Sequence, residues 1–123
     1  MAKKCADTHA SHLRPYLRPG MRLLDCGCGP GTITVGLAAW VTPGEVVGLD
    51  MEPSQIDQAR CRASTDQVTN VRLEVASIYE IPFPDASFDV VFAHTVLQHL
   101  REPAKALQEM RRVLAPGGLV ALR

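Results

Sequence analysis

Three alternating glycines in the segment Asp25–Thr32 are the residues whose spacing points most directly to chemistry. The segment reads Asp-Cys-Gly-Cys-Gly-Pro-Gly-Thr, so few side chains separate its backbone from a ligand, and glycine permits φ angles that other residues avoid. A helix that starts behind such a turn presents free N–H groups and partial positive charge to an anion. Because the residue three positions after Gly29 is Thr32, the pattern is G-x-G-x-G, which differs from the dinucleotide fingerprint G-x-G-x-x-G.

The elements that would position this turn can be read from the apolar pattern. Short apolar runs predict strands at 22–26, 45–50, 71–76, 88–93 and 119–122. Helical spacing predicts helices at 9–17, after Gly31, at 54–63 and along a last stripe of Ala104, Leu107, Met110 and Leu114, which Ala115–Gly118 would end. The alternation of strands and helices predicts an α/β fold, a doubly wound parallel sheet with helices on both faces. In such sheets ligands bind at the carboxyl ends of the strands, where the glycine turn and Asp50 would lie.

The composition indicates one globular domain with a balanced charge. The chain has 123 residues, 46% of them hydrophobic, with 13 Lys plus Arg against 13 Asp plus Glu. This balance gives no support for a nucleic-acid partner or a polybasic membrane surface, and no apolar run approaches the roughly 20 residues of a membrane helix. Residues 1–20 contain His, Arg and Pro where a signal peptide would be apolar, so we expect a cytoplasmic protein.

Four cysteines are expected to be reduced thiols, because no export signal is recognised; they are Cys5, Cys26, Cys28 and Cys61. The Cys26-x-Cys28 pair lacks both the two-residue gap and the second pair of a zinc site, so no metal is expected. Small buried or half-buried side chains are the simpler interpretation.

Several motifs together identify a family that the glycine turn alone would not. With Asp25 in front of it, the G-x-G-x-G turn resembles the first motif of the class I, Rossmann-like methyltransferases that use S-adenosylmethionine. Further segments resemble later motifs of that family, in the same order. Val47–Asp50 resembles the acidic second motif, and Ile81–Asp85 with Ser87–Val91 resembles the "LPFPD-x-SFDVV" stretch. Two more matching segments, Val96–Leu100 and Arg112–Gly118, complete the series. The resemblance covers about residues 10–123 and is to the ubiquinone/menaquinone C-methyltransferase-like group of small-molecule methyltransferases.

The resemblance implies a sheet of about five strands in the order 3-2-1-4-5 and S-adenosylmethionine as cofactor. The backbone of Gly27, Gly29 and Gly31 would face the methionine part and the ribose. Asp50, at the end of the second strand, would accept hydrogen bonds from both ribose hydroxyls. Met51 would lie against the adenine face.

Two further positions have a binding role and a structural alternative. Asp25 would either orient the loop or accept from the cofactor's amino group, directly or through water; alternatively it only braces the turn. Ser77 stands where many relatives have an Asp that accepts from the adenine amino group, and a hydroxyl accepts without the assistance of charge. Alternatively Ser77 is only a turn residue. Ile78 beside it would supply apolar contact and a backbone N–H.

Two histidines are the candidates for acid–base chemistry. His94 follows the fourth strand, near the expected position of the transferred methyl group, where it would contact the cofactor through its backbone or act as a base. His99 is expected in a helix, where packing or solvent exposure is the commoner role. Methyl transfer needs no base when the nucleophile is already reactive, since alignment with the methyl group supplies much of the rate.

The expected function is methyl transfer from S-adenosylmethionine to a small-molecule acceptor. The segment Ala93–Val96 lacks the Asn-Pro-Pro-Tyr type of motif that marks many nucleic-acid and protein N-methyltransferases. The alternative is a cofactor-binding fragment or a non-catalytic interaction module, because residues 1–123 form the cofactor domain without the family's usual C-terminal strands. We therefore expect the fifth strand to be an exposed edge that favours self-association, and methyl transfer to be weak.

Overall fold

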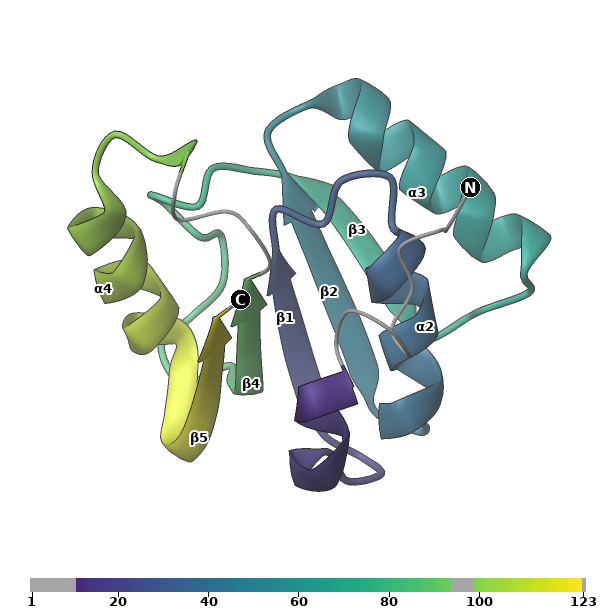
Figure 1. Ribbon diagram of the computed structural model, residues 1–123, viewed down its shortest axis with the longest axis horizontal. Coiled ribbons are helices and arrows are strands. Elements are labelled where there is room, and N and C mark those ends of the chain that lie inside the picture. Colours follow the sequence, from purple (N-terminus) through teal and green to yellow (C-terminus); the bar gives the residue numbers. More distant parts are fainter. Residues whose placement is uncertain (1–10, 94–98, 123) are drawn as a thin grey trace.

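The chain folds around a five-stranded sheet with the strand order β3-β2-β1-β4-β5. A computed structural model describes residues 11–93 and 99–122 of it (Figure 1). The strands are β1 (Arg22–Cys26), β2 (Glu45–Asp50), β3 (Val71–Val75), β4 (Phe88–Ala93) and β5 (Leu114–Leu122). All four strand pairs are parallel, so the predicted fold class and strand order are confirmed. The predicted bounds of β1, β2 and β4 are also confirmed, and β3 ends one residue earlier than expected.

The helical elements are η1 (Ser11–Tyr16), α2 (Thr32–Val41), α3 (Pro53–Thr65) and α4 (Pro103–Val113). η1 is a 3₁₀ helix that contains Pro15, in the region where a short helix was predicted. Both α3 and α4 begin with a proline, whose fixed φ suits the first turn and whose missing N–H needs no partner there. None of the helices in the described ranges is long and apolar enough to span a membrane.

Helices cover both faces of the sheet, as predicted (Figure 1). On one face the strand residues Leu23, Val46 and Phe92 pack against residues of η1 and α2. On the other face Leu24 and Val47 pack in a cluster that includes residues of α4 and of the β3–β4 connection. Side chains alternate between the two faces along each strand, so consecutive buried residues in one strand serve different helices.

The buried face of α4 agrees only in part with the prediction. The buried residues are Ala106, Met110 and Val113, each with 0% exposure, whereas Leu107 is 38% exposed and Ala104 is also exposed. The predicted stripe is therefore right at Met110 and wrong at Ala104 and Leu107. Ala106 contributes little apolar area, but its small side chain fits in the dense cluster between α4 and the sheet.

β5 also starts earlier than the sequence indicated. Residues 115–118 were expected to separate helix from strand, yet β5 begins at Leu114, immediately after α4. Leu114 pairs with Phe88, and the pairing resumes at Leu119 with Val90 after a register shift. The proline and glycines form an irregularity inside the strand rather than a loop, which is where such residues are tolerated in a sheet.

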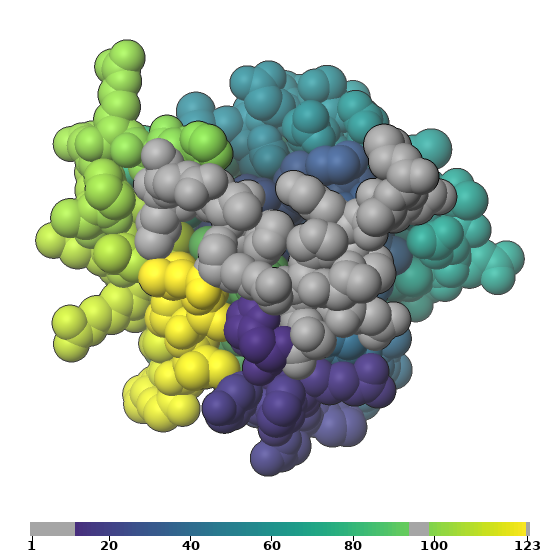
Figure 2. Space-filling view, viewed as in Figure 1, coloured from purple at the N-terminus to yellow at the C-terminus, as the bar shows by residue number. Residues whose placement is uncertain are grey.

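β5 lies at one edge of the described sheet. Figure 2 shows it at the surface between α4 and the N-terminal part of the described chain, and Leu122 on it is 45% exposed. Self-association through this edge stays a prediction.

Candidate functional site

The turn between β1 and α2 has the backbone conformation that its glycines predicted. Gly27, Gly29 and Gly31 have φ angles of 71°, 57° and 83°, all in the left-handed region. At Gly31 there is a second constraint, because a Cβ atom there would lie 2.8 Å from the Cβ of Ala59. The turn therefore depends on glycine both for its dihedral angles and for the close approach of α3.

Hydrogen bonds tie this turn to the end of β2. The N–H of Cys28 donates to the carbonyl of Leu49 at 2.8 Å, and the N–H of Gly29 donates to Oδ2 of Asp50 at 2.9 Å. Oδ1 of Asp50 accepts from the N–H of Glu52 at 3.0 Å. Each carboxylate oxygen has more than one lone pair, so Asp50 can still accept hydrogen bonds from a ligand.

A glycine in β2 makes room for this arrangement. A Cβ atom at Gly48 would lie 2.9 Å from Cδ2 of Leu73 and 3.1 Å from Sγ of Cys28. Without a side chain at Gly48, Cys28 packs down onto the sheet and its backbone reaches Leu49. Within the segment Val47–Asp50, Gly48 is therefore required because a side chain there would collide with Leu73 and Cys28.

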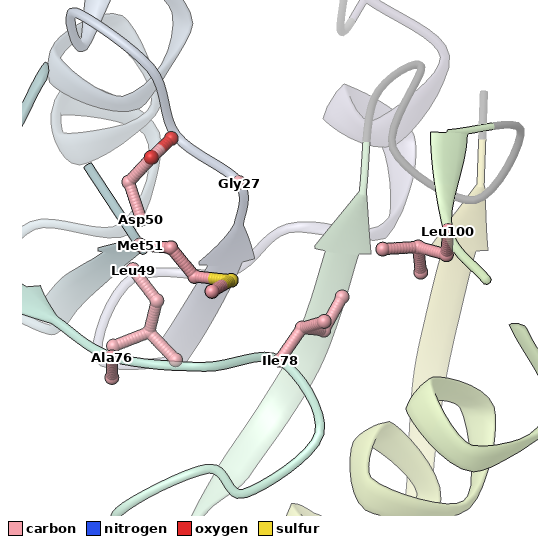
Figure 3. Close-up of a pocket in the computed structure, with 7 residues that line it drawn as sticks. All are labelled: Gly27, Leu49, Asp50, Met51, Ala76, Ile78 and Leu100. Atoms are coloured by element: carbon pink, nitrogen blue, oxygen red, sulfur yellow. The ribbon is translucent and has the colours of Figure 1, made fainter. Parts of the chain in front are cut away.

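A cavity of about 170 Å³ opens beside the turn, at the carboxyl ends of the strands. Its lining is mostly apolar with one carboxylate, as Figure 3 shows: Gly27, Leu49, Asp50, Met51, Ala76, Ile78 and Leu100. Met51 lies between the ends of β1 and β2 and is 63% exposed, while Ile78 and Leu100 form the opposite wall. Its volume is below the roughly 300–1,000 Å³ of typical ligand pockets, so this cavity alone would hold only part of a ligand of ordinary size.

Asp25 lies behind the turn and does not line this cavity. It is 3% exposed, and the hydroxyl of Thr34 on α2 donates to its Oδ2 at 2.6 Å. Burial raises the pKa of Asp25 to about 7, with a smaller contribution from the negative charge of Asp50 and an opposing one from the Thr34 hydrogen bond. This contact supports the bracing role for Asp25, and a direct role in binding stays a prediction.

Ser77 and Ile78 take different positions after β3. The hydroxyl of Ser77 accepts a hydrogen bond from the N–H of Tyr79 at 3.1 Å, and the cavity is lined by its neighbours Ala76 and Ile78. The geometry supports the turn interpretation of Ser77, while Ile78 lies where an apolar contact was expected.

The two histidines were the candidates for acid–base chemistry. His94 lies outside the described residues, and His99 is exposed.

Among the described residues no cluster of three or more His, Cys, Asp or Glu side chains could hold a metal ion. Burial raises the pKa of the Cys26 and Cys28 thiols far above the usual value, so both are inert packing groups at neutral pH.

Sequence reasoning did not identify Leu49, Ala76, Leu100 or Thr34 as parts of this site. Leu49 and Ala76 flank the ends of β2 and β3, so their positions follow from the rule that ligands bind at carboxyl ends. Thr34 lies in the first turn of α2 on its buried side, and a buried polar residue there indicates a buried hydrogen-bond partner. Leu100 carries no signal of its own, because its contact depends on the path of the chain before α4.

Comparison with known proteins gives a consistent result. A family model described as a methyltransferase domain matches residues 17–123. An uncharacterized methyltransferase of Schizosaccharomyces pombe is 38% identical over 128 residues, which covers 99% of this chain and 46% of the relative. The 27-O-demethylrifamycin SV methyltransferase of Amycolatopsis mediterranei is 40% identical over 107 residues, covering 86% of this chain and 39% of the relative.

Solved structures agree with the sequence comparison. A SAM-dependent methyltransferase from Aquifex aeolicus superposes with a TM-score of 0.81 at 29% identity, covering 87% of this chain and 58% of that structure. The chain spans less than half the length of the two curated relatives described above.

Proposed function

This chain belongs to the class I S-adenosylmethionine-dependent methyltransferases, and we propose that it binds S-adenosylmethionine beside the glycine turn and transfers its methyl group to a small organic acceptor. The observation that supports the proposal most strongly is the position of Asp50. Its carboxylate is fixed against Gly29 and lines a cavity with otherwise apolar walls. That combination suits a ligand with a ribose diol and a flat heterocycle.

The residues fit the parts of the cofactor. Asp50 would accept from the ribose hydroxyls, and the backbone at Gly27 and Gly29 would face the methionine part. Met51, Ile78 and Leu100 offer apolar surface for the adenine ring. When bound, the cofactor supplies an electrophilic methyl group on a cationic sulfur.

The protein's own contribution to the reaction would be alignment. Holding a nucleophilic atom of the acceptor in line with the methyl group removes the entropic cost of the encounter. His94 as a base remains part of this proposal for acceptors that must lose a proton.

Support for a small-molecule acceptor comes from relatives such as the demethylrifamycin and demethylmenaquinone methyltransferases. We also propose a cytoplasmic location, which the reduced thiols expected for Cys26, Cys28 and Cys61 would suit.

The test is calorimetric titration with S-adenosylhomocysteine and, separately, with a nicotinamide dinucleotide. We expect the first to bind and the second not to bind, and binding of the dinucleotide alone would contradict the proposal. Turnover with S-adenosylmethionine and candidate acceptors then separates an enzyme from a non-catalytic binding module, which would bind the cofactor without consuming it.

A further inference from the structure

One wall of the cavity comes from a connection that has no helix or strand of its own. Residues 76–87 link β3 to β4, and within them Ala76 and Ile78 line the cavity. The opposite wall is fixed by the hydrogen bonds between the glycine turn and β2. An irregular segment needs other contacts to hold a side chain such as Ile78 in one place.

Arg112, in the last turn of α4, provides a dense set of such contacts. Its Nη2 donates to the carbonyl of Ile81 at 2.8 Å, and its Nη1 donates to the carbonyl of Phe83 at 2.9 Å. Nη1 also donates to Oδ1 of Asp85 at 2.9 Å. One planar guanidinium therefore binds three alternate residues of the connection, a geometry that the point charge of a lysine does not reproduce.

Glu109, one turn earlier on α4, completes the arrangement. Its Oε2 accepts from Nε of Arg112 at 2.7 Å, and its Oε1 accepts from the N–H of Ile81 at 2.9 Å. The backbone N–H of Ala86 donates to the carbonyl of Arg112 at 3.0 Å. Both the N–H and the carbonyl of Ile81 are thus held by this pair of charged side chains, which we call the Glu109–Arg112 clamp.

The segment held by the clamp is packed against the same apolar cluster as Ile78, which lines the cavity. Ile78 and Ile81 are 8% and 2% exposed and lie in one apolar cluster with Ala106 and Met110 of α4. The N-cap residue of α4 also contacts this segment, because the N–H of Glu102 donates to the hydroxyl of Tyr79 at 3.3 Å.

Leu100, the other apolar residue of this wall, lies three positions before the first residue of α4. Ile78 and Leu100 are therefore both positioned by α4, the first through the connection and the second through the chain itself (Figure 3).

We propose that Arg112 and Glu109 are positioning residues of the cofactor site: the clamp sets the distance between the Ile78 wall and Asp50 and so determines affinity for the adenosyl part of the ligand. The inference rests on the proposed function. It assigns a binding role to two residues that do not line the cavity.

The test compares Arg112→Gln with a matched control, Arg22→Gln. Arg22 holds the other end of the same connection, with Nη1 donating to the carbonyl of Ser87 at 2.9 Å and its guanidinium 5.0 Å from the Phe88 ring centroid. It is the first residue of β1, at the end of the sheet away from the cavity. Both variants lose an arginine that binds a carbonyl of the connection, so a general loss of stability affects both.

We expect Arg112→Gln to weaken binding of S-adenosylhomocysteine about ten-fold at a temperature where melting curves show every variant to be folded. Methylthioadenosine, which lacks the amino-acid part, should lose affinity by the same factor. Arg22→Gln should change either affinity by less than about two-fold.

Two milder variants keep the test decisive if Arg112→Gln does not fold. Arg112→Lys should recover part of the affinity, and Glu109→Gln should lose part of it. The inference is overturned if wild type binds the ligand and the Arg112 variants bind equally well, or if Arg22→Gln loses as much affinity as Arg112→Gln. Absence of binding by wild type would instead overturn the proposed function and the inference with it.

Discussion

The backbone N–H of Gly29 and the carboxylate of Asp50 are joined by a hydrogen bond of 2.9 Å, although 20 residues lie between them in the sequence. This bond makes the glycine turn and the end of β2 one structural unit. A ligand that contacts both segments meets a surface that is already assembled, which lowers the ordering cost of binding.

Replacement of Asp50 should weaken cofactor binding more than it weakens the fold. Asp50→Ala removes acceptors for a diol, and hydrogen bonds to charged groups contribute about 1.5–3 kcal/mol, so affinity for S-adenosylhomocysteine should fall by about 10–150-fold. Asp50→Asn keeps one carbonyl oxygen and should lose less. Calorimetry measures both, with Asp57→Ala as the control because the Asp57 side chain is 77% exposed. Unchanged affinity in Asp50→Ala would remove this residue from the site.

Gly31→Ala should be more destabilising than the same change at Gly20. Both glycines have positive φ, 83° and 90°, so alanine is strained at either position by about 1–2 kcal/mol. Only at Gly31 would the new methyl group lie 2.8 Å from Ala59, whereas nothing lies within 4 Å at Gly20. Overpacking should add about 1–3 kcal/mol to the loss at Gly31, measured by urea denaturation. Equal losses would show that α3 moves away without cost.

Asp25 should make the protein less stable as the pH rises through the weakly acidic range. Its pKa is raised to about 7 in the folded chain from an ordinary 3.8, so the folded state binds more protons than the unfolded state between these values. The free energy of unfolding therefore falls with rising pH there, by up to about 4 kcal/mol from this group, and the contribution is constant above the folded pKa.

Denaturation curves of wild type and Asp25→Asn across about pH 4–8 test this, because titration of other groups cancels in the difference. The variant should gain stability relative to wild type as the pH rises. Parallel profiles would mean that Asp25 ionises as readily in the folded state as in the unfolded chain.

Truncation of α4 side chains should identify its buried face. Met110 is fully buried, so Met110→Ala should cost about 2–5 kcal/mol through lost burial and the cavity left behind. Leu107 is 38% exposed, and Leu107→Ala should cost less than about 1 kcal/mol. A larger loss at Leu107 than at Met110 would mean that Leu107 lies on the buried face of α4, as the sequence suggested.

β2 was predictable because a charged residue marks each of its ends. β2 runs through apolar residues from Glu45 to Asp50, and no shift of its bounds would keep both charged groups at the ends. The phase of α4 was harder, because the small Ala106 is buried while the larger Leu107 is not, and apolar area alone ranks them the other way.

The candidate site was predictable where one residue type is required by chemistry or sterics, as at Gly31 and Asp50. It was not predictable where a contact depends on the path of an irregular segment. Ser77 illustrates this limit, since its hydroxyl bonds to the backbone two residues later, a local option open to any serine in a turn. Leu100 is placed only by the docking of α4.

The difference in exposure between Cys61 and the pair Cys26 and Cys28 offers a way to measure local unfolding of the sheet. Cys61 on α3 is exposed, so an alkylating reagent reaches it in the native state, whereas Cys26 and Cys28 are buried with raised pKa values. Alkylation of Cys26 requires the end of β1 to separate from its neighbours, and alkylation of Cys28 requires the glycine turn to lift from β2. The labelling rate at these two sulfurs would therefore measure how often the centre of the sheet unfolds locally. A ligand bound at the glycine turn should lower that rate as its occupancy rises.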